Sequence, residues 1–298
     1  MDLVLTLITA PNSGALSEGM IETATAALRA NGAETGEMRW LATGEACDLF
    51  FTGVTCEAAE KALENCDIAA DKVVQITEGR AKKLLIADMD STMVTGETLD
   101  ELADFAGVKD RVAAITARAM NGELDFEAAL DERVGLLAGM SVEMLDEAWK
   151  RVEYTGGART LVATMRANGA FAALVSGGFD FFTSAVRREL GFDFDQANVL
   201  LTDDGKTLTG KVQKPVLDRQ AKVDALEMLA AQNGITVADA IAVGDGANDL
   251  QMISLAGTGV AFHAKPSVQA QARIRINHGD LTALLYLQGY ARDQFVEA

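Results

Sequence analysis

Two groups of acidic residues in this chain are arranged as a divalent-cation site would require. Asp88 and Asp90 follow one short apolar run, and Asp245 and Asp249 follow another. Carboxylates this close together repel one another unless a cation lies between them or one of them is protonated. Carboxylate oxygens are ligands that Mg²⁺ prefers, and sites that bind and transfer phosphate typically combine Mg²⁺ with glycine-rich backbone. The four carboxylates therefore predict a magnesium site that handles phosphate.

Several other catalytic chemistries lack the residues they need. The chain has only two histidines, which argues against His-rich metal clusters and a Ser-His-Asp triad. Three cysteines at unrelated spacings form neither a disulfide framework nor a zinc site; they are Cys47, Cys56 and Cys66. Gly205-Lys206-Thr207 imitates the end of a Walker A loop, but Leu200 stands where an earlier glycine is required. We interpret this stretch as the turn of a hairpin between residues 199–202 and 207–212.

Four apolar runs are expected to position the acidic groups. Each run ends in polar or glycine-rich residues, and helical stretches separate them; the runs are Leu84–Ala87, Phe171–Val175, Ala240–Val243 and Gly259–Phe262. Short continuous apolar runs between helices are typical of a parallel sheet covered on both faces. Such doubly wound sheets bind their ligands at the carboxyl ends of the strands. We therefore predict an α/β fold with one common site at that edge.

A helical insertion is predicted between the first two runs. It covers residues 97–155 and is closed by Gly156-Gly157. Within it, Arg133 occupies a position on an apolar helical stripe formed by Phe126, Ala129, Leu130, Val134 and Leu137. A guanidinium on an apolar face either extends its charged end to water or binds an anion. The pattern alone leaves both open.

Residues 1–80 are predicted to form a separate small α+β domain. The strand and helix signals follow the order βαββαβ, which is the ferredoxin-like plan. This arrangement resembles the ACT-type modules that sense amino acids in biosynthetic enzymes. The resemblance implies a regulatory or dimerising domain, with an amino-acid effector and a homodimer as partners. A purely structural module fits these residues equally well.

The charge balance argues against two classes of partner. The chain has 26 basic and 44 acidic residues, a net charge of −18. Nucleic acids and anionic membranes both require Lys/Arg surfaces, so we expect neither. No apolar run approaches the length of a membrane span, and Met1–Leu5 lacks the positive region of a signal peptide. These features indicate a cytoplasmic protein.

The motifs together resemble a known family. Asp-x-Asp-x-Thr, Ser-Gly-Gly, a later lysine and Gly-Asp-Gly-x-Asn-Asp, in that order, are similar to the four motifs of haloacid dehalogenase-like phosphohydrolases. More narrowly, residues 84–280 resemble the phosphoserine phosphatase branch of this family. The segments that carry this resemblance are Asp88–Thr98, Asp125–Glu127 through Arg133-Val134, Val175–Phe179, and Gly244–Asp249 with Ala264-Lys265-Pro266. The resemblance implies a sheet core with an inserted helical cap, and Mg²⁺-dependent hydrolysis of O-phospho-L-serine. That reaction releases L-serine and phosphate, the last step of serine biosynthesis, through an aspartyl-phosphate.

The resemblance also implies roles for the reacting groups. Asp88 would be the nucleophile, and Asp90 would act first as general acid and then as general base. Mg²⁺ would be held by the Asp88 carboxylate, the Asp90 backbone carbonyl and Asp245, with Asp249 in support. The phosphoryl oxygens would be bound by a further set of groups: Ser176, the Gly177 amide and Lys222, with Asn248 on the phosphate side.

Substrate choice is expected to lie with the cap. In a phosphorylated amino acid, Glu97 would face the ammonium, Arg133 would bind the carboxylate in a bidentate manner, and Phe126 would shield the pair from water. Lys222 lies in a predicted helix over residues 218–231, where its position alone indicates an ordinary surface lysine. Only the resemblance assigns it to the site.

Other functions remain compatible with parts of the pattern. Transfer of the aspartyl-phosphate to an amino-acid hydroxyl instead of water would make the protein a phosphotransferase. A related phosphatase would act on another small phosphomonoester. A signalling receiver also combines acidic residues at strand ends with a Ser/Thr and a Lys, but it has no helical insertion after the acidic pair. An inert amino-acid sensor is disfavoured by the intact motif set.

Overall fold

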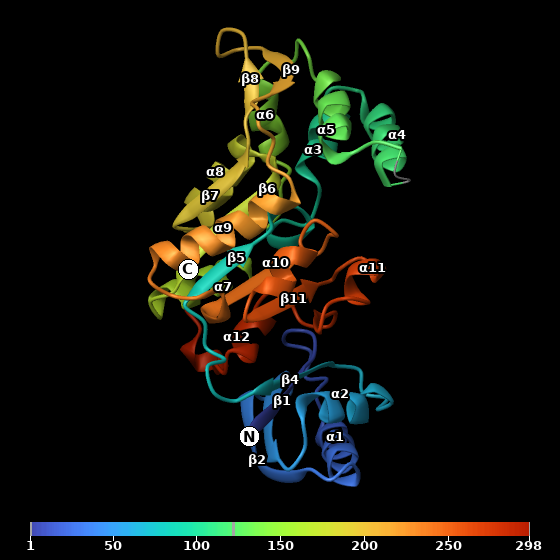
Figure 1. The fold of residues 1–298 in the computed structure, drawn as a ribbon, viewed down its shortest axis with the longest axis vertical. Helices are drawn as coiled ribbons and strands as arrows, with labels where there is room; N and C mark the ends of the chain where they lie inside the picture. Colours follow the sequence, from blue (N-terminus) through green and yellow to red (C-terminus); the bar gives the residue numbers. More distant parts are fainter. Residues whose placement is uncertain (1, 121–122, 298) are drawn as a thin grey trace.

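A computed structural model describes residues 2–120 and 123–297, with a six-stranded parallel sheet at its centre (Figure 1). The strand order is β12-β11-β10-β5-β6-β7, over Ile274–Ile276, Thr258–Phe262, Ala240–Gly244, Leu84–Ala87, Phe171–Phe179 and Phe194–Asn198. Every pairing in this sheet is parallel. The predicted α/β core is therefore confirmed, and the four apolar runs are its central strands. The two outer strands were missed because β12 has only three residues and polar residues interrupt the apolar character of β7.

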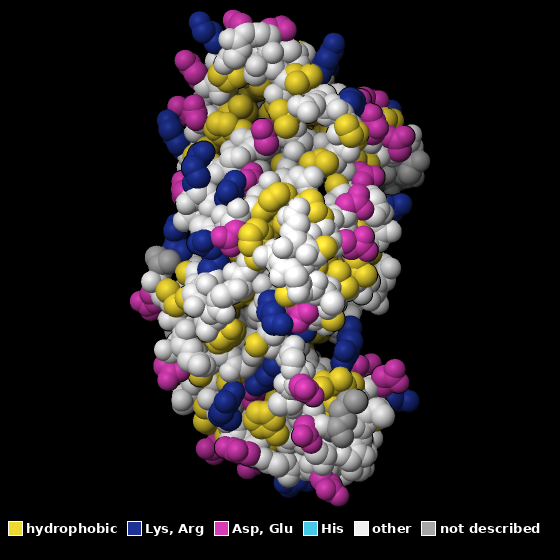
Figure 2. All heavy atoms as spheres, turned by 60° about the vertical axis from the view of Figure 1, so that its left-hand side comes forward, with side chains coloured by type: hydrophobic (Ala, Val, Ile, Leu, Met, Phe, Trp, Pro, Cys, Tyr) yellow, Lys and Arg dark blue, Asp and Glu magenta, His cyan; other side chains and the backbone are white. Residues whose placement is uncertain are grey.

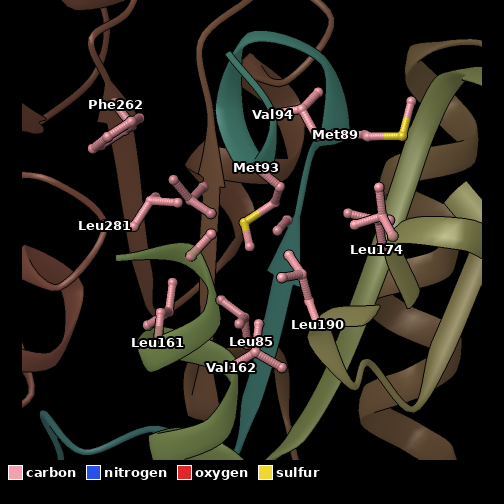
Figure 3. Close-up of a cluster of buried hydrophobic side chains, with 14 of the residues drawn as sticks. Leu85, Met89, Met93, Val94, Leu161, Val162, Leu174, Leu190, Phe262 and Leu281 are labelled. Atoms are coloured by element: carbon pink, nitrogen blue, oxygen red, sulfur yellow. The ribbon is translucent and has the colours of Figure 1, made fainter. Parts of the chain in front are cut away.

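Helices cover both faces of this sheet. Leu84 and Ile86 pack against one set, while Leu85 and Ala87 pack against the other, as the period of two in a strand requires. The second face is shown in Figure 3, where Leu85 of β5 lies beside Leu161 and Val162 of the helix that covers it. The helices are α7 Ala158–Ala167, α8 Asp180–Leu190, α9 Arg219–Gln232, α10 Leu250–Leu255, α11 Pro266–Gln269 and α12 Ala283–Leu287.

Among the described residues, four α-helices lie between β5 and α7, where the insertion was expected. They are α3 Thr98–Phe105, α4 Lys109–Met120, α5 Phe126–Gly135 and α6 Glu143–Trp149. The chain enters and leaves this cap side by side, because Val94 and Tyr154 form an antiparallel bridge. Gly157, just after the exit, has φ +78°, and a Cβ there would lie 2.7 Å from the Thr282 nitrogen. The close approach of the chain to Thr282 at this point therefore requires glycine.

The predicted hairpin is confirmed by strands β8 Leu200–Thr202 and β9 Leu208–Val212, which pair antiparallel. It packs against the cap rather than the central sheet, and the Leu208 amide donates to the Met140 carbonyl at 2.8 Å. In Figure 1 the hairpin and the cap form the end of the molecule opposite the N-terminal sheet.

The N-terminal segment forms a four-stranded antiparallel sheet in the order β2-β3-β1-β4. Its elements are β1 Leu3–Ile8, α1 Glu18–Ala30, β2 Glu34–Ala42, β3 Ala46–Thr52, α2 Cys56–Glu64 and β4 Asp71–Ile76. Helices α1 and α2 cover one face, and side chains such as Leu5 form the core beneath them. The other face, through Ile8 and Val73, packs against Leu285 and Tyr286 of the C-terminal segment.

Polar contacts fix the N-terminal sheet to that segment. The Asp71 carboxylate accepts from the backbone amides of Asn277 at 2.7 Å, His278 at 3.0 Å and Gly279 at 2.9 Å. Glu45 accepts from the Tyr286 hydroxyl at 2.8 Å and the Arg292 guanidinium at 2.6 Å. These partners lie more than 200 residues apart in the chain, so they hold its two ends together.

Replacing Asp71 by Ala is expected to lower the free energy of unfolding by about 2–4 kcal/mol, because three backbone amides lose a charged acceptor. Urea titration of the full chain measures this change. Asp67→Ala is the matched control, since Asp67 is exposed in the loop that leads into the same strand. Equal losses for the two variants, or no loss for Asp71→Ala, would contradict the role of this contact.

The surface of the molecule mixes charges of both signs. Figure 2 shows Lys and Arg side chains interspersed with Asp and Glu over one face, without a continuous basic area on that face. Among the described helices, none combines the length and apolar character needed to cross a membrane.

Candidate active site

The acidic residues predicted from the sequence meet at the carboxyl edge of the parallel sheet. Asp88 directly follows β5, and its backbone amide donates to the Val243 carbonyl of β10 at 3.0 Å. Asp245 follows β10, and Asp249 begins α10. Carboxylate oxygens of Asp88, Asp245 and Asp249 all lie within 4.8 Å of one another, and all three residues are buried.

Lys222 from α9 lies within this cluster. Its side chain is 2% exposed, so it is not the surface lysine that its helical position indicated. Its Nζ lies 2.6 Å from Asp88 Oδ1 and 2.5 Å from Asp249 Oδ1. Burial opposes the charged form, but the Asp88 and Asp249 carboxylates outweigh it and raise the pKa of the Lys222 ammonium.

The charge of this cluster fits a cation. Burial raises the pKa of Asp88 well above its usual range, and the Asp249 carboxylate raises it further, while Lys222 opposes both. Three buried carboxylates face the buried Lys222 ammonium and, 3.6 Å from Asp245, the half-exposed ammonium of Lys265. One negative charge is left uncompensated in a site of low dielectric. Asp249 has both oxygens engaged, by Lys222 and by the Gly246 amide at 2.9 Å. Asp88 and Asp245 are therefore the carboxylates suited to ligate a hard cation, with Asp249 in a supporting position.

Asp90 is held in a different setting, on the irregular turn after β5. Its Oδ1 accepts from the Thr98 amide at 2.8 Å, and its Oδ2 lies 3.4 Å from the Ser176 hydroxyl. Burial raises the pKa of Asp90 to about 6, with a further contribution from the Glu97 carboxylate. A carboxyl with this pKa is suited to give and take a proton near neutral pH.

Ser176, Gly177 and Gly178 lie near the end of β6, where the strand forms a bulged loop beside Asp90. The Gly178 amide donates to Ser176 Oγ at 2.9 Å. A Cβ at Gly178 would lie only 2.8 Å from Asp90 Oδ2, so the loop approaches the acidic turn this closely only because that residue is glycine. The Ser176 hydroxyl and the Asp90 carboxyl therefore face the same space.

The cap places two of the predicted residues over this loop. Phe126 begins α5, and a Cβ at Gly177 would lie 3.6 Å from its ring. Arg133 lies two turns further on α5, and its Nε donates to the Ala129 carbonyl at 3.1 Å. Within the described parts of the chain, its guanidinium forms no ion pair. Burial lowers the pKa of Arg133, although Asp100 and Glu97 oppose this effect.

The structure places the remaining predicted residues near the same edge. Glu97 is exposed at the start of α3 and accepts from the Ser91 hydroxyl at 2.9 Å. Asn248 is half-buried on the turn that joins Asp245 to Asp249, close to Gly246. Two contacts of the site were missed from the sequence: the Thr98 amide on Asp90, and Asn198, whose side chain contacts Gly177. The position of Thr98 at the first turn of α3 offered a weak signal, because amides there have no partner within the helix. Asn198 offered none.

Comparison with known proteins agrees with this geometry. The family model described as haloacid dehalogenase-like hydrolase matches residues 85–254. The chain belongs to the haloacid dehalogenase-like hydrolase family. Its matched segment runs from β5 to α10 and so contains every acidic group of the cluster.

Individual members of the family are similar over more of the chain. A phosphoserine phosphatase of Streptomyces coelicolor is 44% identical over 82% of this chain, which spans 58% of that protein. One of Methanocaldococcus jannaschii is 44% identical over 69% of this chain and 97% of its own length. The unliganded crystal structure of a probable phosphoserine phosphatase from Vibrio cholerae has a TM-score of 0.78 and 31% identity, covering 98% of this chain and 88% of that one. The similarity to this last hydrolase includes the N-terminal sheet.

Proposed function

We propose that the protein is a Mg²⁺-dependent phosphoserine phosphatase, which hydrolyses O-phospho-L-serine to L-serine and phosphate. The observation that carries the proposal is the buried pair of Asp88 and Lys222 beside Asp245 and Asp249. Relatives named phosphoserine phosphatase support it, at 42–48% identity. The chain spans only 58% of the Streptomyces protein and 53% of the Mycobacterium tuberculosis protein SerB2. The activity of these longer proteins is therefore proposed, not assumed, for this chain.

The reaction begins at Asp88. One of its carboxylate oxygens attacks phosphorus, and the bond between phosphorus and the serine oxygen breaks. Asp90, whose pKa of about 6 keeps a fraction of the carboxyl protonated near neutral pH, gives its proton to the departing alkoxide. Water then attacks the aspartyl-phosphate while Asp90 takes up a proton, which releases phosphate and restores the Asp88 carboxylate.

The phosphoryl oxygens are bound by groups that meet Asp88 from two sides. Lys222 approaches from α9, and Ser176 with the Gly177 amide approaches from the bulged end of β6. These donors are fixed before substrate arrives, so they stabilise charge as it develops on phosphorus. A Mg²⁺ ion held by Asp88, the Asp90 carbonyl and Asp245 would neutralise phosphate charge beside an anionic nucleophile, and Asn248 would orient the phosphate side.

Recognition of the amino acid falls to the cap. Arg133 has a partly buried guanidinium whose two NH₂ groups are suited to a carboxylate. Glu97 supplies the negative charge for the ammonium group, and Phe126 covers Gly177 and excludes water. A phosphorylated amino acid therefore has a complementary group for each of its three charges.

The N-terminal sheet and the location of the protein extend this proposal. The ferredoxin-like order of β1–β4 supports an ACT-like domain that binds an amino-acid effector or joins two copies of the chain. The three cysteines are free thiols, which supports a cytoplasmic location.

The direct test is phosphate release from O-phosphoserine with and without Mg²⁺. We expect release that stops when EDTA removes the metal and returns when Mg²⁺ is added. Including free serine or threonine as acceptor separates hydrolysis from phosphotransfer, because transfer yields a phosphorylated acceptor and less free phosphate. Release from other small phosphomonoesters with higher kcat/KM than from phosphoserine would overturn the substrate assignment.

A further inference from the structure

The loop that holds Ser176 and Gly177 is a bulge in the parallel sheet. Strands β6 and β7 pair regularly up to Val175 opposite Gln196, and the pairing resumes at Phe179 opposite Asn198. Three residues of β6 therefore lie opposite one residue of β7. A bulge of this size leaves backbone groups of the longer strand outside the ladder, so another group must hold them in place.

Asn198 holds this bulge through its side chain. It is 2% exposed, and its Nδ2 donates to the Gly177 carbonyl at 2.9 Å. The Gly177 carbonyl and the Gly178 amide belong to the same peptide unit, and the Gly178 amide donates to Ser176 Oγ at 2.9 Å. The Gly177–Gly178 peptide is thus fixed at both its oxygen and its nitrogen. This fixes the orientation of the adjoining backbone, including the Gly177 amide.

The same side chain also holds the start of α9. Asn198 Oδ1 accepts from the Leu217 amide at 2.7 Å, and Nδ2 donates to the Leu217 carbonyl at 3.2 Å. Leu217 directly precedes Asp218, the N-cap of α9, and Lys222 lies in the first turn of that helix. One buried amide therefore connects the Gly177 loop to the helix that carries Lys222.

We propose that Asn198 is a positioning residue that sets the spacing between the Gly177 amide and the Lys222 ammonium. This inference rests on the proposed function, in which both groups bind the phosphoryl oxygens. Asn198 itself touches no reacting atom. Because it acts on the phosphoryl side, its loss should affect every phosphate ester alike, whatever the rest of the substrate contains.

The test is Asn198→Asp, which keeps the shape and the acceptor for the Leu217 amide but has no donor for the Gly177 carbonyl. We expect kcat to fall by about 10- to 100-fold, less than the loss of a whole oxyanion donor. The fall should be equal for phosphoserine and for a small aryl phosphate, with KM changed by less than about threefold. Asn168→Asp is the matched control, since its amide also donates to a backbone carbonyl, Thr164 at 2.8 Å, away from the site.

Each outcome decides the inference. An unchanged kcat in a folded variant overturns it, and so does a loss confined to phosphoserine, which would place the effect in the cap. An equal loss in Asn168→Asp assigns the effect to general stability and also overturns it. If Asn198→Asp does not fold, Asn198→Ser is measured against the same outcomes. A wild-type chain inactive on both substrates would instead refute the proposed function, and the inference with it.

Discussion

The Asp88→Asn variant should lose at least about 10³-fold of its phosphate release from phosphoserine, because a neutral amide cannot form the acyl-phosphate. Its fold should remain intact. Asp88 is one of three buried carboxylates, and burial together with Asp249 raises its pKa. Removing its charge relieves repulsion, while Lys222 keeps its contact with Asp249 at 2.5 Å.

The measurement pairs kinetics with unfolding. We expect the thermal midpoint of metal-free Asp88→Asn to lie at or above that of the wild type, so that lost activity is not lost structure. Asp110→Asn, at an exposed position of α4, should leave both quantities unchanged. Turnover within tenfold of the wild type, after mass spectrometry has excluded deamidation back to Asp, would remove Asp88 from the nucleophile role.

The Arg133→Lys variant should separate substrate recognition from chemistry. Lysine keeps the charge but loses the bidentate geometry, which costs a charge-assisted hydrogen bond of about 1.5–3 kcal/mol. The expected loss in kcat/KM for phosphoserine is roughly 10- to 150-fold. A small aryl phosphate has no carboxylate for Arg133 to bind, so its hydrolysis should change much less.

A second arginine of the cap provides the control. Arg118 lies 2.7 Å from Glu132 and is exposed, so Arg118→Lys should leave both substrates unaffected. Equal losses on the two substrates in Arg133→Lys would mean that Arg133 acts on the phosphoryl group or on the cap. If kcat/KM for both substrates is unchanged in Arg133→Lys, Arg133 does not bind substrate and only extends its charged end along an apolar face to water.

The strands and helices that build the core were predictable because the apolar pattern of each short segment indicates how it is buried. Leu84–Ala87 and Ala240–Val243 are continuous apolar runs bounded by polar residues, as strands buried on both faces require. The order of strands and helices in residues 1–80 follows equally from local periodicity. Strand β7 was missed because Asp195 and Gln196 interrupt its apolar character at the sheet edge.

Side chains whose role depends on distant partners were harder to predict. Lys222 was expected from its helical position to be a surface lysine, whereas the structure buries it together with Ala225 and Leu226. The carboxylates that it contacts lie far away in the chain, so the helix itself gave no sign of them. Asn198 gave no local signal, because its function depends on a register shift between two strands. The Asp71 contacts with residues 277–279 likewise arise only when the two ends of the chain meet.

The most direct test of the account is to look for phosphate on Asp88 during turnover. Wild-type protein is mixed with phosphoserine and Mg²⁺, quenched in acid within a single turnover, and reduced with borohydride, which converts an acyl-phosphate at an aspartate into homoserine. Peptide mass spectrometry then locates the modified residue. We expect homoserine at position 88 and nowhere else. Phosphate release without any modified residue, or modification at Asp90 or Asp245 instead, would contradict it.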